Sequence, residues 1–336
     1  MNGEKKKLKM AVIGAGGMGT RWAEAIRSHA RAELSLVIDT DIAKAKNLAE
    51  RLGARAADSF DARESAPDID AAVVALPHRF LAPAAARALQ RGMHVLVEKP
   101  GAINSEEMKK AADLAREKNL RLMVAYNHRF HQGMRELRRL ADSGFLGGIM
   151  FIRAVYGFGG RKEYGKEWRH QKEMSGGGEL IDQGVHLIDA ARWFLGDIAD
   201  ARGLTQNAFW KSGVEDNAFM LLKNKEGKIA SLHASWSQWD PRFVFEIYGD
   251  RGYARMQGLG KKYGGVERVF YAARRDDFSL PREEMIECDT DADNSLRRAL
   301  DEFVSAIAEE RDPRPGGEDA LAVLKIVEDL YRNTAA

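Results

Sequence analysis

The chain has almost no cysteine, little proline and no excess of either charge. Cys288 is the only cysteine among 336 residues, so no disulfide can form within the chain, and we expect a reducing, cytoplasmic setting. Eight prolines exclude a proline-rich linker protein. The formal net charge of +2 lacks the basic excess of proteins that bind nucleic acids or anionic membranes through charge.

Long apolar runs are also missing. No stretch reaches the roughly 18 apolar residues that a membrane span requires, so no membrane partner is expected. Four lysines, at positions 5, 6, 7 and 9, precede an apolar run, as in a secretory signal peptide, but glycines interrupt that run and disfavour this interpretation. The hydrophobic share of 45% is enough for buried cores, and the length favours about two domains.

Residues 1–125 alternate between short apolar runs and stretches with helical spacing. This alternation predicts an α/β domain with a doubly wound parallel sheet, whose strands are covered on both faces. The expected strands are 9–13, 34–38, 71–76, 94–97 and 121–125, and the expected helices are 20–28, 42–52, 81–91 and 106–118.

In residues 126–336 several strand-like runs follow one another without helices between them. This pattern predicts an α+β domain with a large, mostly antiparallel open sheet. The segment 157–178 is polar, aromatic and too long for a simple connection, so we expect it to be functional. The expected strands are 149–156, 218–222, 229–236, 243–248, 253–256 and 266–271, and the expected helices are 131–142, 179–195, 294–309 and 318–332.

A G-x-G-x-x-G motif follows the first expected strand and begins the first expected helix. In such a loop Gly14 allows a tight turn, Gly16 lets a pyrophosphate approach the backbone, and Gly19 lets the helix pack on the strand. The N-terminus of the helix then offers N–H donors to the phosphates. The loop therefore predicts a dinucleotide site, with Gly14, Gly16, Gly17, Met18 and Gly19 as cofactor-binding residues.

Asp39 lies twenty residues beyond Gly19, at the end of the second expected strand. A carboxylate there can accept hydrogen bonds from ribose hydroxyls and would repel a 2′-phosphate, so NAD is favoured over NADP. Asp39 can equally be a turn residue that caps the next helix, and both interpretations can hold together.

Two further strand ends carry candidate residues. Pro77 and His78 follow one strand and are expected near the cofactor, as is Glu98. Lys99 stands in a Glu-Lys-Pro sequence where the carboxyl end of a strand faces the ligand crevice of an open α/β sheet. Its ammonium could stabilise a developing alkoxide, although a solvated lysine before a helix is the alternative.

The block 176–189 holds a second group of polar residues. Asp182 and His186 are four residues apart, which places both on one face of a helix, and Asp189 follows three residues later. A histidine beside a carboxylate suits general acid–base catalysis. An ion pair on a solvated helix face is the alternative. A metal site is disfavoured, because no further set of His or Cys ligands is evident.

An aromatic segment precedes this block. Tyr164, Trp168 and Arg169 could form a polar, aromatic wall for a sugar ring or an attached phosphate. Tryptophan and arginine are also common in contacts between subunits, so this second interpretation stays open.

Taken in order, these motifs resemble the glucose–fructose oxidoreductase/inositol 2-dehydrogenase (Gfo/Idh/MocA) family over essentially the whole chain. The resemblance rests on the glycine loop, Glu98-Lys99-Pro100, Tyr126-Asn127-His128-Arg129-Phe130, Trp168-Arg169 and the Gly176–His186 block. It implies a Rossmann domain at 1–125 and a domain for substrate binding and oligomerisation at 126–336. It also implies that Lys99 faces the substrate, that Asp182 and His186 form the motif of the second domain, and that Asn127 and Arg129 line the junction of nicotinamide and substrate.

The expected activity is an NAD-dependent dehydrogenation. A ring hydroxyl of a cyclic polyol, sugar, sugar phosphate or nucleotide sugar is oxidised reversibly to a ketone. The catalytic residues are Lys99, Asp182 and His186, and no metal is expected. Arg129, Tyr164, Trp168 and Arg169 are the further substrate-binding candidates. Two alternatives stay open: a glycoside hydrolase that retains NAD and oxidises its sugar transiently, and a non-catalytic sensor of ligand and NAD.

Assembly is expected as well. If helices cover one face of the second sheet, the other face exposes apolar side chains over an area that is too large for a monomer. A homodimer or homotetramer through this sheet is therefore expected.

Overall fold

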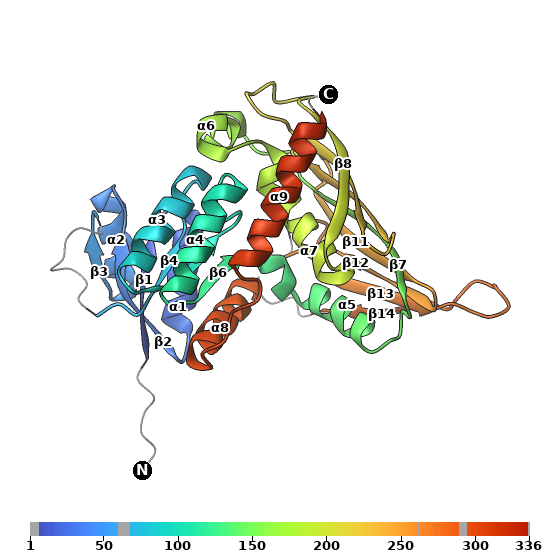
Figure 1. Cartoon of the computed structure of the whole chain (residues 1–336), viewed down its shortest axis with the longest axis horizontal. Helices are drawn as coiled ribbons and strands as arrows, with labels where there is room; N and C mark the ends of the chain where they lie inside the picture. Colours follow the sequence, from blue (N-terminus) through green and yellow to red (C-terminus); the bar gives the residue numbers. More distant parts are fainter. Residues whose placement is uncertain (1–6, 60–67, 261, 289–293, 335–336) are drawn as a thin grey trace, which may run out of the picture. The chain divides into compact units, whose positions relative to one another are not determined.

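The computed structural model describes residues 7–59, 68–260, 262–288 and 294–334 (Figure 1). The chain forms two compact units, one of Met1–Tyr126 with Leu296–Ala322 and one of Asn127–Ser295 with Val323–Ala336. Residues 296–322 thus return to the first unit and pack with it. The sequence predicted a single boundary between residues 125 and 126, which would have placed these residues in the second domain. Helix α9 (Gly317–Thr334) contributes residues to both units.

The first unit is built on a six-stranded parallel sheet in the order β3-β2-β1-β4-β5-β6. Its strands are apolar and largely buried, as the continuous hydrophobic runs predict, and the doubly wound fold class is confirmed. The strands are β1 (Leu8–Ile13), β2 (Ala32–Ile38), β3 (Arg55–Ala57), β4 (Ala71–Val74), β5 (His94–Glu98) and β6 (Leu122–Ala125). The helices are α1 (Gly17–Ser28), α2 (Ile42–Leu52), α3 (His78–Gln90), α4 (Ser105–Glu117) and α8 (Ser295–Ala308).

The strand order of this sheet reverses between β1 and β4, which lie side by side. Open α/β sheets bind their ligands at such a reversal, outside the carboxyl ends of the strands. The segments that follow β1 and β4 in the sequence therefore occupy the position where a ligand is expected.

The second unit contains an eight-stranded sheet in the order β14-β13-β12-β11-β7-β10-β9-β8, in which β7 and β10 form the one parallel pair of the described strands. This confirms the mostly antiparallel open sheet. Its strands are β7 (Ile149–Gly157), β8 (Ile198–Gln206), β9 (Asn217–Asn224), β10 (Ile229–Ser235), β11 (Arg242–Gly249), β12 (Gly252–Gln257), β13 (Arg268–Ala273) and β14 (Glu284–Glu287). Strands β8 and β14, and β3 of the first sheet, are not among the expected strands.

Helices of the second unit pack on one face of this sheet (Figure 1). Helix α7 (Val185–Leu195) contacts β7 and β10, and α5 (Gln132–Asp142) contacts β12 and β13. The short helices are η2 (Asn127–Phe130), η3 (Tyr164–Lys166), η4 (Trp168–His170), α6 (Lys172–Ser175) and the π-helix η5 (Leu180–Gly184). The expected helix 179–195 is therefore a π turn that continues into α7.

The opposite face of the sheet, called the open face below, exposes apolar side chains among the described residues. Along β9 the side chains alternate, with Met220 and Leu222 buried and with Phe219 and Leu221 exposed. Strand β10 alternates in the same way. In the part of the chain that the structure describes, no helix is long and apolar enough to span a membrane.

Candidate active site

The glycine loop joins β1 to α1 at the carboxyl edge of the first sheet. Gly14 has a φ of 102°, and a Cβ added to it would lie 2.3 Å from the carbonyl oxygen of Ala75. A Cβ on Gly19 would lie 1.7 Å from the carbonyl oxygen of Gly14. Gly16 and Gly17, in contrast, face space in which no atom lies within 4 Å of an added Cβ. The fold thus requires the first and last glycine, while the middle two leave room for a ligand.

The start of α1 suits a pyrophosphate. Its first turn carries no acidic residue, and Gly16 at the N-cap has no side chain to occupy the first N–H groups. A phosphate can therefore take the place of a capping side chain and meet the positive end of the helix dipole. The residues present fit the dinucleotide that the motif predicts.

Asp39 lies directly after β2, beside the same loop. Its Oδ2 accepts a hydrogen bond from the N–H of Ala15 at 2.7 Å, and its Oδ1 accepts one from the N–H of Asp41 at 2.9 Å. Asp41, rather than Asp39, caps α2 by accepting from the N–H groups of Ala43 and Lys44. Asp39 therefore organises the turn and also holds a carboxylate next to the glycine loop, where a ribose is expected.

The ends of β4 and β5 bring the other candidates of the first unit to this edge. Pro77 is the N-cap of α3, and the buried His78 begins that helix. Glu98 is buried and accepts a hydrogen bond from Trp22 Nε1 at 2.7 Å. Burial raises the pKa of Glu98, and the Trp22 hydrogen bond opposes that rise. Lys99, the next residue, is partly exposed, so Glu98 anchors the strand end from which Lys99 extends.

In the second unit, Asp182 lies on η5 and His186 lies in the first turn of α7. Both side chains are buried, with exposed fractions of 4% and 5%, which contradicts the alternative of an ion pair on a solvated helix face. Asp182 Oδ2 accepts a hydrogen bond from Arg169 Nε at 3.2 Å. A π turn is frequent at functional sites, and here it carries the candidate carboxylate.

His186 stacks on a second histidine. The rings of His128 and His186 are nearly parallel, with an interplanar angle of 9° and centroids 3.8 Å apart. Tyr156 meets both rings edge-on, at 4.9 Å from His128 and 6.3 Å from His186. The imidazole of His186 is thus held in one plane by aromatic contacts from η2 and β7.

Arg129 and Asp189 form a buried, bidentate ion pair. Arg129 Nε and one terminal nitrogen donate to the two carboxylate oxygens of Asp189 at 2.8 and 2.6 Å. Asp189 therefore pairs with Arg129 on η2. The sequence spacing had predicted that it lies beside His186. This pair ties η2 to α7 and so holds His128 against His186. Asn127, also on η2, donates from Nδ2 to Ser295 Oγ at 2.9 Å.

The three candidates of the aromatic segment lie in two different surroundings. Trp168 stacks under the guanidinium of Arg169, which is 4.6 Å from the ring centroid, and Arg169 reaches Asp182. Tyr164 has an exposed fraction of only 1% and packs in a core with Val214 and Trp236. Arg169 thus contacts Asp182 and Trp168 stacks on Arg169, whereas Tyr164 is a core residue of the same segment.

Sequence reasoning gave no role to His128 and Tyr156. His128 lies inside the Tyr126–Phe130 motif, but its contact with His186 joins residues 58 positions apart. Tyr156 reads as an ordinary strand residue, and no spacing pattern reveals that its ring faces the two histidines. Among the residues that the structure describes, no group of three or more His, Cys, Asp or Glu side chains is arranged to hold a metal ion.

The fold and these two sets of residues define a class of protein: an enzyme with a dinucleotide-binding α/β unit and an α+β unit that carries the buried candidates Asp182 and His186. A family model described as an oxidoreductase family with an NAD-binding Rossmann fold matches residues 8–126, and the GFO/IDH/MocA C-terminal domain matches residues 134–255. The chain belongs to the Gfo/Idh/MocA family of NAD-binding oxidoreductases. The predicted family and the predicted NAD cofactor are confirmed.

Individual relatives agree with this placement. The dTDP-3,4-didehydro-2,6-dideoxy-alpha-D-glucose 3-reductase of Saccharopolyspora spinosa is 30% identical over 286 residues, 84% of this chain and 85% of that protein. The inositol 2-dehydrogenase of Rhizobium meliloti (strain 1021) is 25% identical over 338 residues, 98% of this chain and 97% of that protein. The structure of GenD2 from gentamicin A biosynthesis in complex with NAD is 26% identical, with a TM-score of 0.84, and covers 98% of this chain and 95% of that one.

Proposed function

We propose that this enzyme transfers hydride reversibly between NAD and a ring carbon of a cyclic polyol, sugar, sugar phosphate or nucleotide sugar. The observation that carries the proposal is the pair of buried side chains Asp182 and His186, held by Arg169 and His128 on consecutive helical turns. The names of the relatives, which act on an inositol and on a nucleotide sugar, support a ring hydroxyl or ketone as the reacting group.

Each catalytic candidate has a defined part in this chemistry. When bound, the nicotinamide supplies the acceptor or donor of hydride for the carbon that bears the reacting oxygen. During oxidation His186 takes the proton of the hydroxyl, and the ammonium of Lys99 donates a hydrogen bond to the oxygen as its negative charge develops. Asp182 orients His186 or accepts a hydrogen bond from a neighbouring hydroxyl of the substrate. In reduction the same residues act in reverse.

A screen followed by a rate measurement tests this function. Sugars, inositols and nucleotide sugars are added with NAD in a thermal-shift assay, and every stabilising compound is then tested for formation of NADH. We expect at least one compound to give NADH in large excess over enzyme. Formation of no more than one NADH per enzyme, together with glycoside cleavage, would instead favour a hydrolase that retains its cofactor. Binding without any turnover would favour a sensor.

We also propose that the protein works in the cytoplasm, where its single cysteine, the buried Cys288, stays reduced.

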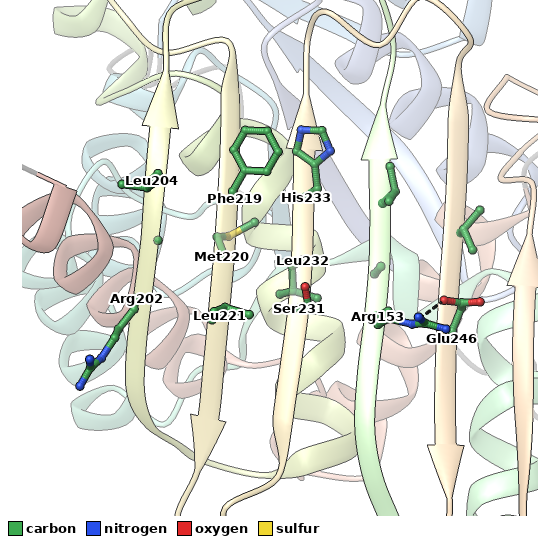
Figure 2. A pocket seen from close by; sticks show the side chains of 14 residues that line it. Arg153, Arg202, Leu204, Phe219, Met220, Leu221, Ser231, Leu232, His233 and Glu246 are labelled. Carbon is green, nitrogen blue, oxygen red and sulfur yellow. Dashed lines mark ion pairs between the residues drawn. The ribbon is translucent and has the colours of Figure 1, made fainter.

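We further propose that the chain assembles through the open face of its second sheet. A hollow of about 660 Å³ lies on this face, and Figure 2 shows side chains of β8, β9, β10, β7 and β11 around it. Leu204 and Leu221 are 70% and 55% exposed, and Phe219 stacks on His233 with centroids 4.1 Å apart. An apolar surface of this kind, with the Arg153–Glu246 ion pair among its lining, is typical of a subunit interface.

A further inference from the structure

One oxygen of Glu215 accepts three hydrogen bonds at the start of the π turn. Its Oε1 receives the N–H of Gly178 at 3.0 Å, the N–H of Leu180 at 3.1 Å and the hydroxyl of Tyr331 at 2.7 Å. The backbone adds a fourth contact, since the N–H of Glu179 donates to the carbonyl oxygen of Glu215 at 3.0 Å. Glu215 lies just before β9, and Tyr331 lies in the last turns of α9.

The first N–H groups of a helical segment have no partners within the helix. At η5 the Glu215 carboxylate, which comes from a different element, accepts from the first of these groups, the N–H of Leu180, and also from the N–H of Gly178 just before the N-cap. The carboxylate thus lies at the positive end of the helical segment. Glu215 thus performs the task of a capping residue from outside the helix.

The glycines before η5 make room for this arrangement. A Cβ on Gly177 would lie 2.1 Å from the hydroxyl oxygen of Tyr331, and a Cβ on Gly178 would lie 2.0 Å from the carbonyl oxygen of Glu215. The glycine run 176–178 therefore has a structural reason at its second and third positions, which is the close approach of Tyr331 and Glu215.

The same contacts lead directly to the candidate acid–base residues. The N–H of Asp182 donates to the carbonyl oxygen of Gly178 at 3.0 Å, so the backbone of Asp182 is fixed to the residue that Glu215 holds. His186 follows one helical turn later on the continuous η5–α7 segment. We propose that Glu215 and Tyr331 are positioning residues, which fix the turn that carries Asp182 and thereby the orientation of Asp182 and His186. This inference rests on the proposed function of those two residues.

Burial raises the pKa of Glu215, and the hydrogen bonds from Tyr331, Leu180 and Gly178 oppose that rise because they favour the charged carboxylate. Burial and the charge of Glu215 raise the pKa of Tyr331 well above its ordinary value, so the hydroxyl stays a donor at any working pH. Tyr331 also belongs to a fixed end of α9, because Asn333 Nδ2 donates to the carbonyl oxygen of Ala201 on β8 at 3.0 Å.

The test compares Tyr331→Phe with Tyr271→Phe. Both substitutions remove a hydroxyl that donates to a glutamate at 2.7 Å, but Tyr271 lies on β13 and bonds Glu284 in an exposed position. Amide hydrogen exchange, which needs no substrate, is followed at Gly178 and Leu180. Turnover is measured with NAD and the screened sugar or inositol that the unmodified enzyme oxidises fastest. Substrate KM and NAD affinity are determined separately.

We expect Tyr331→Phe to accelerate exchange at Gly178 and Leu180 and to lower kcat roughly tenfold, since small displacements of catalytic groups cost rate rather than binding. NAD affinity should not change, and Tyr271→Phe should match the unmodified enzyme in every measurement. Glu215→Ala should lose roughly a hundredfold in kcat, whereas Glu215→Gln, which keeps an acceptor oxygen, should recover most of it. The Gln–Ala comparison remains decisive if Tyr331→Phe folds poorly.

Equal exchange and equal kcat in Tyr331→Phe and Tyr271→Phe, with Glu215→Gln no better than Glu215→Ala, would overturn the inference. His186→Ala is measured in parallel. Full turnover in His186→Ala would show that the proposed base role of His186 is wrong, while an inactive His186→Ala beside a fully active Tyr331→Phe would reject only the positioning role.

Discussion

Three buried carboxylates of the second unit each lie against a basic side chain. Arg129 pairs with Asp189, Arg169 with Asp182, and His131 Nδ1 lies 2.6 Å from Glu267 Oε1. A hydrogen bond from His131 lowers the pKa of Glu267 even though burial alone would raise it. Each pair joins segments that are 13 to 136 positions apart in sequence. These pairs could not be predicted from the sequence, because nothing local relates the two partners.

The Arg129–Asp189 pair gives a stability prediction. Asp189→Ala leaves a buried guanidinium without its carboxylate, and we expect a loss of about 3–5 kcal/mol in the free energy of unfolding. Asp197→Ala is the control, because Asp197 bonds Arg192 with 77% of its side chain exposed and should cost about 1 kcal/mol or less. Urea unfolding measures the free energy of unfolding of both variants. A similar small loss in the two variants would show that the buried pair does not hold η2 to α7.

We expect the carboxylate of Asp39 to determine the preference for NAD over NADP. Its carboxylate lies beside the glycine loop and would repel a 2′-phosphate, so NAD should bind more tightly than NADP. Asp39→Ala should narrow the difference in affinity between NAD and NADP. The substitution weakens NAD binding and removes the repulsion of the 2′-phosphate of NADP. Calorimetric titration of both cofactors measures it, and equal affinities in the unmodified protein would rule out this role for Asp39.

At the scale of elements, apolar runs and helical periodicity predict most of the fold. The helix 42–52 agrees with α2 residue for residue, and the expected strands of the first unit agree to within two residues at each end. Strand β8 was missed because Asp200, Arg202 and Gly203 interrupt its apolar pattern. The π turn η5 was predicted only as helix, since no sequence pattern separates a π turn from an α turn.

The glycine loop allows folding and binding to be separated. Gly16→Ala adds a methyl group where no atom lies within 4 Å, so stability should change by less than about 1 kcal/mol. The same methyl group lies where a pyrophosphate must approach, so NAD affinity should fall, by roughly tenfold or more. Gly19→Ala is the contrast, because its Cβ would overlap the carbonyl of Gly14 and should destabilise the fold itself. Unchanged NAD binding in Gly16→Ala would place the pyrophosphate elsewhere.

At the scale of the whole molecule, the sequence indicates two domains and candidate residues in each of them. The glycine loop, Asp39 and Lys99 lie at one edge of the first sheet, and Asp182 and His186 lie together in the second unit. Their functional roles stay predictions. The return of residues 296–322 to the first unit was not foreseen, because amphipathic helices such as α8 do not reveal which unit they cover.

The open sheet face gives a prediction about assembly. Phe219→Asp places a charge among the exposed apolar side chains of this face and should dissociate a dimer or tetramer, because burying an unpaired carboxylate is costly. Phe80→Asp is a matched control, since Phe80 on α3 is 44% exposed and Phe219 is 46% exposed. Light scattering at micromolar concentration gives the mass. A monomeric unmodified protein, or equal masses for both variants, would contradict assembly through this face.

The central claim is that His186 is the base of the oxidation and that Lys99 stabilises the oxygen. It is tested most directly by the pH dependence of alcohol oxidation in the unmodified enzyme, His186→Ala and Lys99→Ala. A base must be neutral to accept a proton, so the rate should rise with pH as the imidazole of His186 loses its proton. His186→Ala should lose roughly 10²–10⁴-fold in turnover together with that inflection, with NAD affinity unchanged. Lys99→Ala should lose turnover and keep the inflection. An active His186→Ala enzyme with an unchanged pH profile would contradict the assignment and move the proton transfer to Lys99.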